Sequence, residues 1–198
     1  MNINPICFGQ KFPIMKCNVK DERHNKYAEV TLSEYDCKDY SDIKEVNEQC
    51  KHWEFGFNFA DDMNIKRLDY LAGREPYPAN YYVMEDKNKK IIGLCETVDF
   101  GNDTNIEFIE AKRNSGYKYI GQTMLAMMGK ILLKRKGENL CVAHPYIEAV
   151  PFYTDKCGFD SVKDDKHIFS LFMNNQQIKD FIERVQGKTN APIKEITE

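Results

Sequence analysis

The segment from Ile106 to Leu125 holds the most distinctive chemistry in this sequence, because it joins a predicted strand to a predicted helix through a basic, glycine-containing loop. Backbone N–H groups at the start of a helix lack intrahelical acceptors, and the helix dipole strengthens their attraction for an anion. Lys112, Arg113 and Lys118 place positive charge in the same loop, where it could help to bind a further phosphate. The segment therefore predicts a local site for a phosphate or pyrophosphate group.

Three ionisable side chains on predicted strands are candidates for acid–base chemistry. Glu96 interrupts an otherwise apolar strand face, and burial of a carboxylate in that direction raises its pKa. Glu107 lies on the predicted strand that leads into the loop, and His144 ends a later strand. For each glutamate, a solvated or ion-paired strand position is an equally good interpretation. His144 is the third candidate, because it could instead cap a turn.

The elements that must position these groups follow from the spacing of apolar residues. Apolar residues recur at helical spacing after the capping candidates Asp39 and Ser41, and a second helix carries Ile65, Leu68 and Ala72 on one side. A chain that passes from an antiparallel meander to β-α-β units predicts a mixed α/β (α+β) fold, with one mostly antiparallel sheet flanked by helices on both faces. The predicted order is a strand over 27–35, helices over 43–53 and 61–72, strands over 81–86, 91–100 and 106–111, a helix over 120–136, a strand over 140–144, a short helix over 147–156, a strand over 167–173 and a helix over 176–186.

The length of 198 residues, 42% of them hydrophobic, is enough for one domain with short appendages. We expect residues 1–25 to be an N-terminal extension, 26–187 to be the domain and 188–198 to be a flexible C-terminal tail. The chain has 28 Lys and Arg residues against 31 Asp and Glu residues, a formal net charge of -3. This balance predicts no overall attraction to nucleic acid or to an anionic membrane, so phosphate binding must be local.

The composition also bears on compartment and metal content. No run is long enough to span a bilayer, and polar and breaking residues interrupt Met1 to Phe12 where a signal peptide would need an apolar run. The seven cysteines are scattered without a C-x-x-C pair, which favours reduced thiols. His24, His52 and His167 show no metal-ligand spacing. We therefore expect a cytoplasmic protein with no metal and with neither nucleic acid nor membrane as a partner.

Two segments together resemble the GNAT family of acyl-coenzyme A-dependent N-acetyltransferases. The first is I-E-F-I-E-A-K-R-N-S-G-Y-K-Y-I-G-Q-T-M-L at 106–125, and the second is A-V-P-F-Y-T-D-K-C-G-F at 149–159. The resemblance covers the chain from Tyr27 to Asn174. It implies a GNAT-like sheet, acetyl-coenzyme A as cosubstrate and an acyltransferase that acetylates an amine.

The resemblance also implies positions that bind the cosubstrate. In the family, the strand before the loop pairs its backbone with the pantetheine arm, and a loop of pattern R/Q-x-x-G-x-G/A cradles the pyrophosphate. Ungapped alignment retains only the last glycine of this pattern, Gly121, and places Gly116 and Tyr119 at the family's Arg or Gln and first Gly. A loop that no longer binds coenzyme A is the alternative interpretation. The implied cosubstrate-binding residues are Ile109, Glu110, Ala111, Gly116, Tyr117, Lys118, Tyr119, Ile120, Gly121 and Gln122.

The second segment implies a catalytic acid. In the family, a tyrosine at the position of Tyr153 often protonates the departing coenzyme A thiolate, whereas packing under the sheet is the alternative interpretation. The amine must lose a proton before it attacks, so Glu107 or Glu96 is the candidate general base. A backbone N–H between Ile109 and Ala111 would stabilise the oxyanion in a direct transfer within a ternary complex, without a metal.

Two other functions fit the same residues. The first is a non-catalytic module of this fold whose sheet binds other proteins. The second is a transferase for protein amines rather than small molecules, because acceptor loops carry no transferable motif. The Phe-rich stretch from Trp53 to Asp62 is expected to line the acceptor side, although its aromatic rings could equally form core. The sequence does not determine the oligomeric state, and a homodimer is one candidate.

Overall fold

The structure is a computed structural model that describes residues 11–54, 56–74, 79–163 and 168–196. Cys7 and His167 lie outside these ranges, and the six cysteines inside them are free thiols. The described strands form one sheet in the order β10-β1-β2-β3-β4-β5-β7-β9-β8, with β6 paired to β1. Their bounds are β1 Phe12–Asp21, β2 Lys26–Tyr35, β3 Ala79–Asp86, β4 Ile91–Phe100, β5 Asp103–Ala111, β6 Tyr117–Lys118, β7 Asn139–Ala143, β8 Asp160–Lys163, β9 Ile168–Asn174 and β10 Lys194–Glu195.

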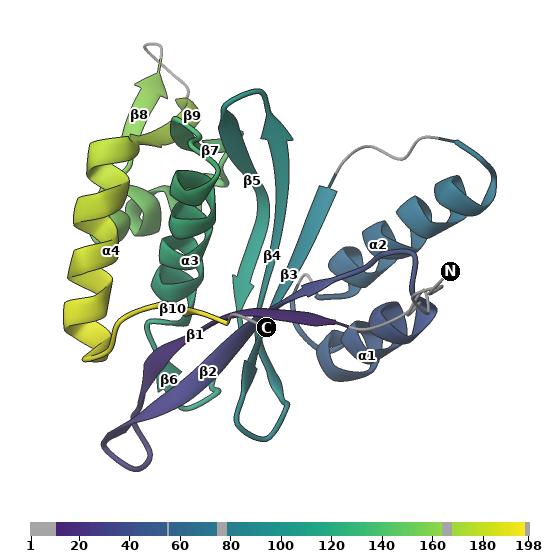
Figure 1. Ribbon diagram of the computed structural model, residues 1–198, viewed down its shortest axis with the longest axis horizontal. Coiled ribbons are helices and arrows are strands. Elements are labelled where there is room, and N and C mark those ends of the chain that lie inside the picture. The colour runs from purple at the N-terminus through teal and green to yellow at the C-terminus, as the bar shows by residue number, and fades with distance from the viewer. Residues whose placement is uncertain (1–10, 55, 75–78, 164–167, 197–198) are drawn as a thin grey trace, which may run out of the picture.

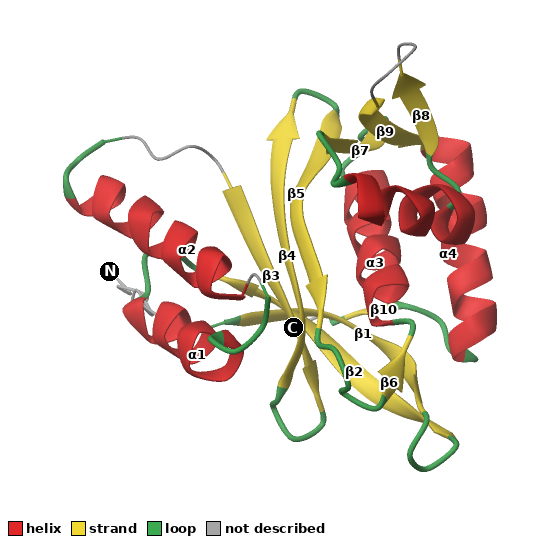
Figure 2. Cartoon of the chain, turned by 180° about the vertical axis from the view of Figure 1, so that it is seen from behind, coloured by secondary structure: helices red, strands yellow, loops and turns green. Residues whose placement is uncertain are grey.

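Helices cover both sides of the sheet. Figures 1 and 2 show α1 and α2 on one side of the central strands β3 to β5, and α3 and α4 on the other. Among the described helices, none is long and apolar enough to cross a membrane. Their bounds are α1 Tyr40–Cys50, α2 Gly56–Leu71, α3 Ile120–Lys134 and α4 Asn175–Thr189, with a short 3₁₀ helix at Ile147–Ala149 and a π-helix at Phe152–Cys157.

Two hydrophobic clusters join these layers. The larger cluster contains Met124 of α3 and Phe181 of α4, and the smaller one contains Phe59 of α2 and Leu94 of β4. Gly93 lets α3 approach β4 closely, because a Cβ at this position would lie 2.3 Å from Met124 Sδ. The mostly antiparallel sheet with helices on both faces confirms the predicted fold class.

Parts of the predicted extension and tail belong to the sheet. β1 pairs with β2 from Phe12 to Asp21, inside the segment 1–25 that was expected to precede the domain. At the other end, α4 extends to Thr189 and β10 pairs with β1 inside the predicted tail. The physical reason is that β1 pairs with the backbone groups of β2, which would otherwise form an open sheet edge, and β10 in turn pairs with β1.

The second helix buries a different side from the one predicted. Ile65 and Leu68 are 49% and 50% exposed, whereas Phe59 and Met63 are buried. α2 begins at Gly56 rather than at residue 61, so its first turns supply the buried side chains. Figure 1 shows its C-terminal half extending away from the sheet, and Leu68 and Leu71 in this half are exposed.

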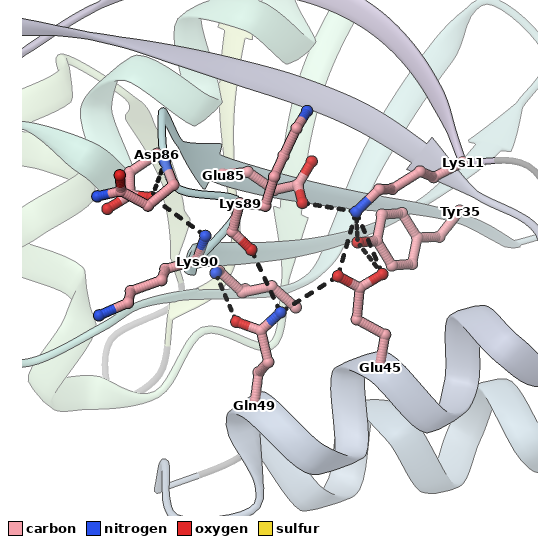
Figure 3. Close-up of polar contacts among 10 residues, drawn as sticks. Lys11, Tyr35, Glu45, Gln49, Glu85, Asp86, Lys89 and Lys90 are labelled. Atoms are coloured by element: carbon pink, nitrogen blue, oxygen red, sulfur yellow. Dashed lines mark hydrogen bonds and ion pairs between the residues drawn. The ribbon is translucent and has the colours of Figure 1, made fainter.

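The positive charge of Lys11, just before β1, compensates the negative charge of the buried Glu85 carboxylate of β3 (Figure 3). The Glu85 side chain is fully buried, and Lys11 Nζ lies 2.7 Å from its Oε1 and 3.1 Å from Glu45 Oε1 of α1. Tyr35 OH donates a hydrogen bond to Glu45 at 3.2 Å. Although desolvation lowers it, hydrogen bonds to Glu85 and Glu45 leave the pKa of Lys11 above its ordinary value. The network connects the start of β1 to both neighbouring elements.

Candidate active site

The sheet forks between the parallel neighbours β5 and β7. Their register pairs only two residues of each strand, and the last pair is Asn105 with Cys141. Beyond Asn105, no described strand pairs with this edge of β5, although β5 continues along β4 to its end. The predicted pantetheine-binding residues Ile109, Glu110 and Ala111 lie in this stretch. About half of their backbone N–H and C=O groups therefore face the fork, where they could pair with an extended ligand.

A β-bulge in β5 directs two consecutive side chains to the same side of the sheet. Glu96 of β4 lies opposite Phe108 and Thr97 lies opposite Ile106, which leaves Glu107 as the extra residue. In a regular strand Glu107 and Phe108 would point to opposite faces, but here both line one cavity. The bulge therefore brings both candidate bases, Glu96 and Glu107, to the same place.

This cavity of about 450 Å³ lies between α2 and the strands β4 and β5. Its walls combine carboxylates with aromatic rings, and the ring centroids of Phe59 and Phe108 are 5.5 Å apart. Carboxylates and the faces of aromatic rings both attract cations, so the lining suits an ammonium group with an apolar body. The lining residues are Asn58, Phe59, Asp62, Lys66, Glu96, Val98, Glu107 and Phe108.

Glu96 has a strongly perturbed acidity in this cavity. Burial raises the pKa of Glu96 to about 7, with further increases from Asp62 and Glu107, while Lys66 acts in the opposite direction. Asp62 itself accepts a hydrogen bond from Tyr81 OH of β3. A carboxylate with this pKa can take up a proton near neutral pH, as a general base must. The raised value agrees with the effect predicted from its apolar strand face.

The start of α3 offers backbone donors that the side chain of its N-cap residue does not cap. The first helical hydrogen bond runs from Thr123 N–H to Tyr119 O at 2.8 Å, so the N–H groups of Ile120, Gly121 and Gln122 precede it. Tyr119 occupies the N-cap, makes no side-chain capping hydrogen bond and has a left-handed backbone with φ of 69°. Glycine adopts this conformation without strain, which explains a glycine at the corresponding family position. The geometry suits an anion.

The loop before this helix contacts the hairpin of β1 and β2. Gly116 O accepts a hydrogen bond from Glu22 N at 2.9 Å, and Lys118 Nζ lies 2.5 Å from Glu22 Oε1. Tyr117 and Lys118 form β6, and Tyr117 OH donates to Asp86 at 3.3 Å. These three predicted loop residues thus have structural contacts, and their part in binding the cosubstrate stays a prediction.

The other two basic residues of the loop turn toward the connection between α1 and α2. Arg113 forms an ion pair with Glu54, and Lys112 Nζ lies 5.9 Å from the centroid of the Trp53 ring. Together with neighbouring side chains they line a second cavity of about 490 Å³. The three basic side chains of this loop therefore contact different neighbours and do not point together at one phosphate position.

A lysine from α4 lies beside the start of α3. Lys188 Nζ is 5.7 Å from the centroid of the Tyr119 ring and 3.5 Å from Gln122 Oε1. Gln122 also donates to a carbonyl oxygen of the π-helix at 2.8 Å, and Gly121 lies against Phe152, whose ring would be 3.1 Å from an added Cβ. The sequence predictions missed Lys188, because it lies far from the loop along the chain.

Tyr153 lies on the opposite side of β4 from Glu96. Its side chain is 6% exposed, and its ring centroid lies 5.2 Å from that of Phe152 and 5.4 Å from that of Phe159. Tyr153 shares the larger hydrophobic cluster with Cys95, whereas the next residue, Glu96, lines the cavity against α2. Burial raises the pKa of Tyr153, so its phenol remains protonated at neutral pH. The candidate acid and the candidate base Glu96 therefore lie on opposite faces of β4.

The third candidate base, His144, is not among the residues that line the Glu96 cavity. It follows β7, is exposed and has a left-handed backbone with φ of 48°. Within the described ranges, no group of His, Cys, Asp and Glu side chains is arranged to hold a metal ion. Sequence reasoning missed Asn105 at the fork, and it named Asp62 only as the end of an aromatic stretch. A helix begun at Gly56 would have placed Phe59 and Asp62 on one face.

Comparison with known proteins identifies the fold. A scan against protein-family models and a search of curated proteins give no match. The PaiA N-acetyltransferase from Thermoplasma acidophilum, solved with coenzyme A, is 15% identical with a TM-score of 0.52, and the match covers 73% of this chain and 98% of that one. A GNAT-family acetyltransferase from Staphylococcus aureus Mu50 is 14% identical with a TM-score of 0.54, covering 74% and 99%.

A third structure, a chimera of the spermidine N-acetyltransferase SpeG from Vibrio cholerae and hSSAT, shows the same similarity. It is 14% identical with a TM-score of 0.56, covering 76% of this chain and 98% of that one. The chain therefore has the GNAT N-acetyltransferase fold. This confirms, for the fold, the resemblance seen in the sequence.

Proposed function

We propose that this protein is a cytoplasmic N-acetyltransferase that transfers an acetyl group directly from acetyl-coenzyme A to an amine. The observation that carries the proposal is the position of Glu96, a carboxylate of raised pKa that lines a cavity beside the bulge of β5. A bound ammonium must lose a proton before its nitrogen attacks a thioester, and Glu96 can accept that proton. The solved structure of a similarly folded N-acetyltransferase with coenzyme A supports the same cosubstrate here.

The residues at the fork and at the start of α3 fit coenzyme A. The N–H groups of Ile120, Gly121 and Gln122 precede the first helical hydrogen bond and would hold the pyrophosphate, with Lys188 adding positive charge. The backbone edge of β5 that faces the fork would pair with the pantetheine arm. Acetyl-coenzyme A supplies the thioester when bound, and a backbone N–H on this edge would stabilise negative charge on the carbonyl oxygen.

The proposed acceptor is a positively charged aliphatic amine. Three carboxylates, those of Asp62, Glu96 and Glu107, share the cavity with one cation, Lys66. A cationic substrate would compensate this excess of negative charge, and the Phe rings would contact its methylene groups. The name of one solved neighbour, a spermidine N-acetyltransferase, makes spermidine a sensible first acceptor to test.

Binding and thiol release test the proposed function together. We expect calorimetry to show saturable binding of acetyl-coenzyme A with a dissociation constant below about 1 mM, and an amine panel to give amine-dependent release of coenzyme A thiol. The panel should include spermidine, lysine and a lysine-containing peptide. Absence of binding would contradict the proposal. Binding without thiol release for any amine would instead favour the non-catalytic module.

Tyr153 is the proposed general acid for the departing thiolate. We expect Tyr153→Phe to lower kcat about 100-fold while the affinity for acetyl-coenzyme A stays within a factor of about three, because the proton is needed only in the transition state. Steady-state kinetics and calorimetry on the same preparation measure the two quantities. Since the side chain is buried among Phe152 and Phe159, equal losses of turnover and affinity would show that its role is packing.

A further inference from the structure

Asn105 connects the two strands at the fork of the sheet. It is the last residue of β5 that pairs with β7, and it is only 8% exposed. Its Oδ1 accepts a hydrogen bond from Ala143 N–H of β7 at 3.0 Å, and its Nδ2 donates one to Glu107 Oε1 at 2.5 Å. One side chain therefore continues the link to β7 where backbone pairing stops, and it also holds the carboxylate of the bulge residue.

Both contacts depend on the carboxamide group. An amide presents an acceptor and a donor on one short side chain, so Asn105 can satisfy a backbone N–H and a carboxylate together. An aspartate of the same shape would keep the acceptor but would repel Glu107. An alanine would remove both hydrogen bonds and leave the Ala143 N–H without this acceptor.

The hydrogen bond from Asn105 is important for the position of the Glu107 carboxylate, because the Glu107 side chain is exposed. An exposed glutamate without a hydrogen-bond donor samples many rotamers, most of which carry its charge away from the cavity. The groups that act on Glu96 are Asp62 and Lys66 of α2, Glu107 of β5 and Tyr81 of β3. Glu107 is the member of this group whose side chain Asn105 holds.

We infer that Asn105 is a positioning residue that keeps the Glu107 carboxylate at the acceptor cavity, where its charge acts on the base Glu96. This inference rests on the proposed function. Asn105 is not among the residues that line the acceptor cavity, and its effect passes through Glu107. Its removal should therefore change the pH dependence of the reaction and not only the stability of the fold.

A double-mutant cycle followed over pH tests this role. We expect Asn105→Ala to move the ascending limb of kcat/KM for the acceptor to lower pH by a fraction of a pH unit, because Glu107 raises the pKa of Glu96 less than burial and Asp62 do. Glu107→Gln should move the limb in the same direction. In the Glu107→Gln background, Asn105→Ala should add no further shift, because the two residues act as one unit. An equal shift in both backgrounds, or no shift in the single variant, would overturn the inference.

A matched control comes from the turn before β5. Asn102 Nδ2 also donates to a glutamate, Glu138 Oε1 at 2.9 Å, but on the surface and away from the cavity. Asn102→Ala should leave the pH profile of kcat/KM unchanged. A shift equal to that of Asn105→Ala would show that the effect is not specific to the fork.

An NMR measurement on the folded protein tests the same contact without enzymatic turnover, in case a variant is inactive or does not fold. In the wild-type protein, the side-chain amide protons of Asn105 in NMR should show the downfield shift of a hydrogen bond to a carboxylate, and Glu107→Gln should reduce that shift. Asn105 side-chain signals that are the same in wild type and in Glu107→Gln would overturn the inference. If the wild-type protein transfers no acetyl group, the proposed function fails, while these signals still decide whether Asn105 holds Glu107.

Discussion

Glu96→Gln is expected to lower kcat/KM for the amine acceptor by about 100-fold or more, the range lost when a general base is removed. Glutamine keeps the size of the side chain but cannot accept the proton of the ammonium group. In the wild-type protein the rate should rise with pH through an ascending limb centred near pH 7, since burial raises the pKa of Glu96 to about 7. Initial rates from about pH 5 to pH 9 measure both effects, and the limb should be absent in the variant.

The same substitution should raise stability above neutral pH. The pKa of Glu96 lies above the ordinary value of 4.5, so between 4.5 and about 7 the folded chain binds more protons than the unfolded chain. Stability contributed by this group is therefore lost as pH rises through that window. Glutamine has no charged form, so the melting temperature of Glu96→Gln relative to wild type should increase with pH. If the melting temperature of Glu96→Gln fell below that of wild type only at high pH, the result would contradict burial of the Glu96 carboxylate.

Glu107→Gln is the matched control for this substitution. The two carboxylates line the same cavity, but Glu107 is the exposed residue of the bulge whereas Glu96 is partly buried. We expect the Glu107 variant to keep an ascending limb, moved to lower pH, and to lose less activity than Glu96→Gln. A larger loss in the Glu107 variant would assign the role of base to Glu107.

Lys11→Met is expected to lower the free energy of unfolding by about 3 kcal/mol, the cost typical for breaking a buried ion pair by removing one partner. Lys11 Nζ lies 2.7 Å from Glu85 Oε1, and the Glu85 side chain is 0% exposed. Its other oxygen, Oε2, has no hydrogen-bond partner among the described residues. Without the ammonium group the buried carboxylate loses its compensating charge. Urea unfolding at neutral pH measures the change.

Two further variants separate this effect from a general loss of surface charge. Lys16→Met removes an exposed pair of β1, in which Lys16 Nζ lies 3.1 Å from Glu29 Oε1, and it should change stability by less than about 0.5 kcal/mol. Adding Glu85→Gln to Lys11→Met should recover most of the loss, because position 85 then carries no buried charge. A Lys11 variant as stable as Lys16→Met would show that Glu85 does not depend on its partner.

Local patterns were sufficient to predict most of the elements. The alternation in 27–35 corresponds to β2, and the three antiparallel strands before α3 correspond to β3, β4 and β5. These predictions succeed because a half-buried strand or a one-sided helix repeats its apolar residues with its own period. The buried face of α2 was missed because periodicity does not show where a helix leaves the body of the protein.

Some residues of the candidate site could be predicted from the sequence, and others could not. From the sequence alone, a carboxylate on an apolar strand face singled out Glu96, and the strand–loop–helix segment singled out the start of α3. The alternative for Tyr153, packing under the sheet, could not be decided by pattern, and the structure shows a buried aromatic contact that leaves a role as acid to be tested. Glu107 reaches the cavity through a bulge, which is a matter of register between strands rather than of composition.

The sequence by itself determined the order of most strands and helices, because the apolar periods that mark them depend on near neighbours in the chain. The raised pKa of Glu96 depends on burial and on groups of other elements, Asp62, Lys66 and Glu107. Only the tertiary structure decided which distant groups meet. Asn105 accepts a hydrogen bond from a residue 38 positions away, and Lys188 reaches Gln122 across 66 positions. Such contacts arise when packing closes long loops, and no local period records them.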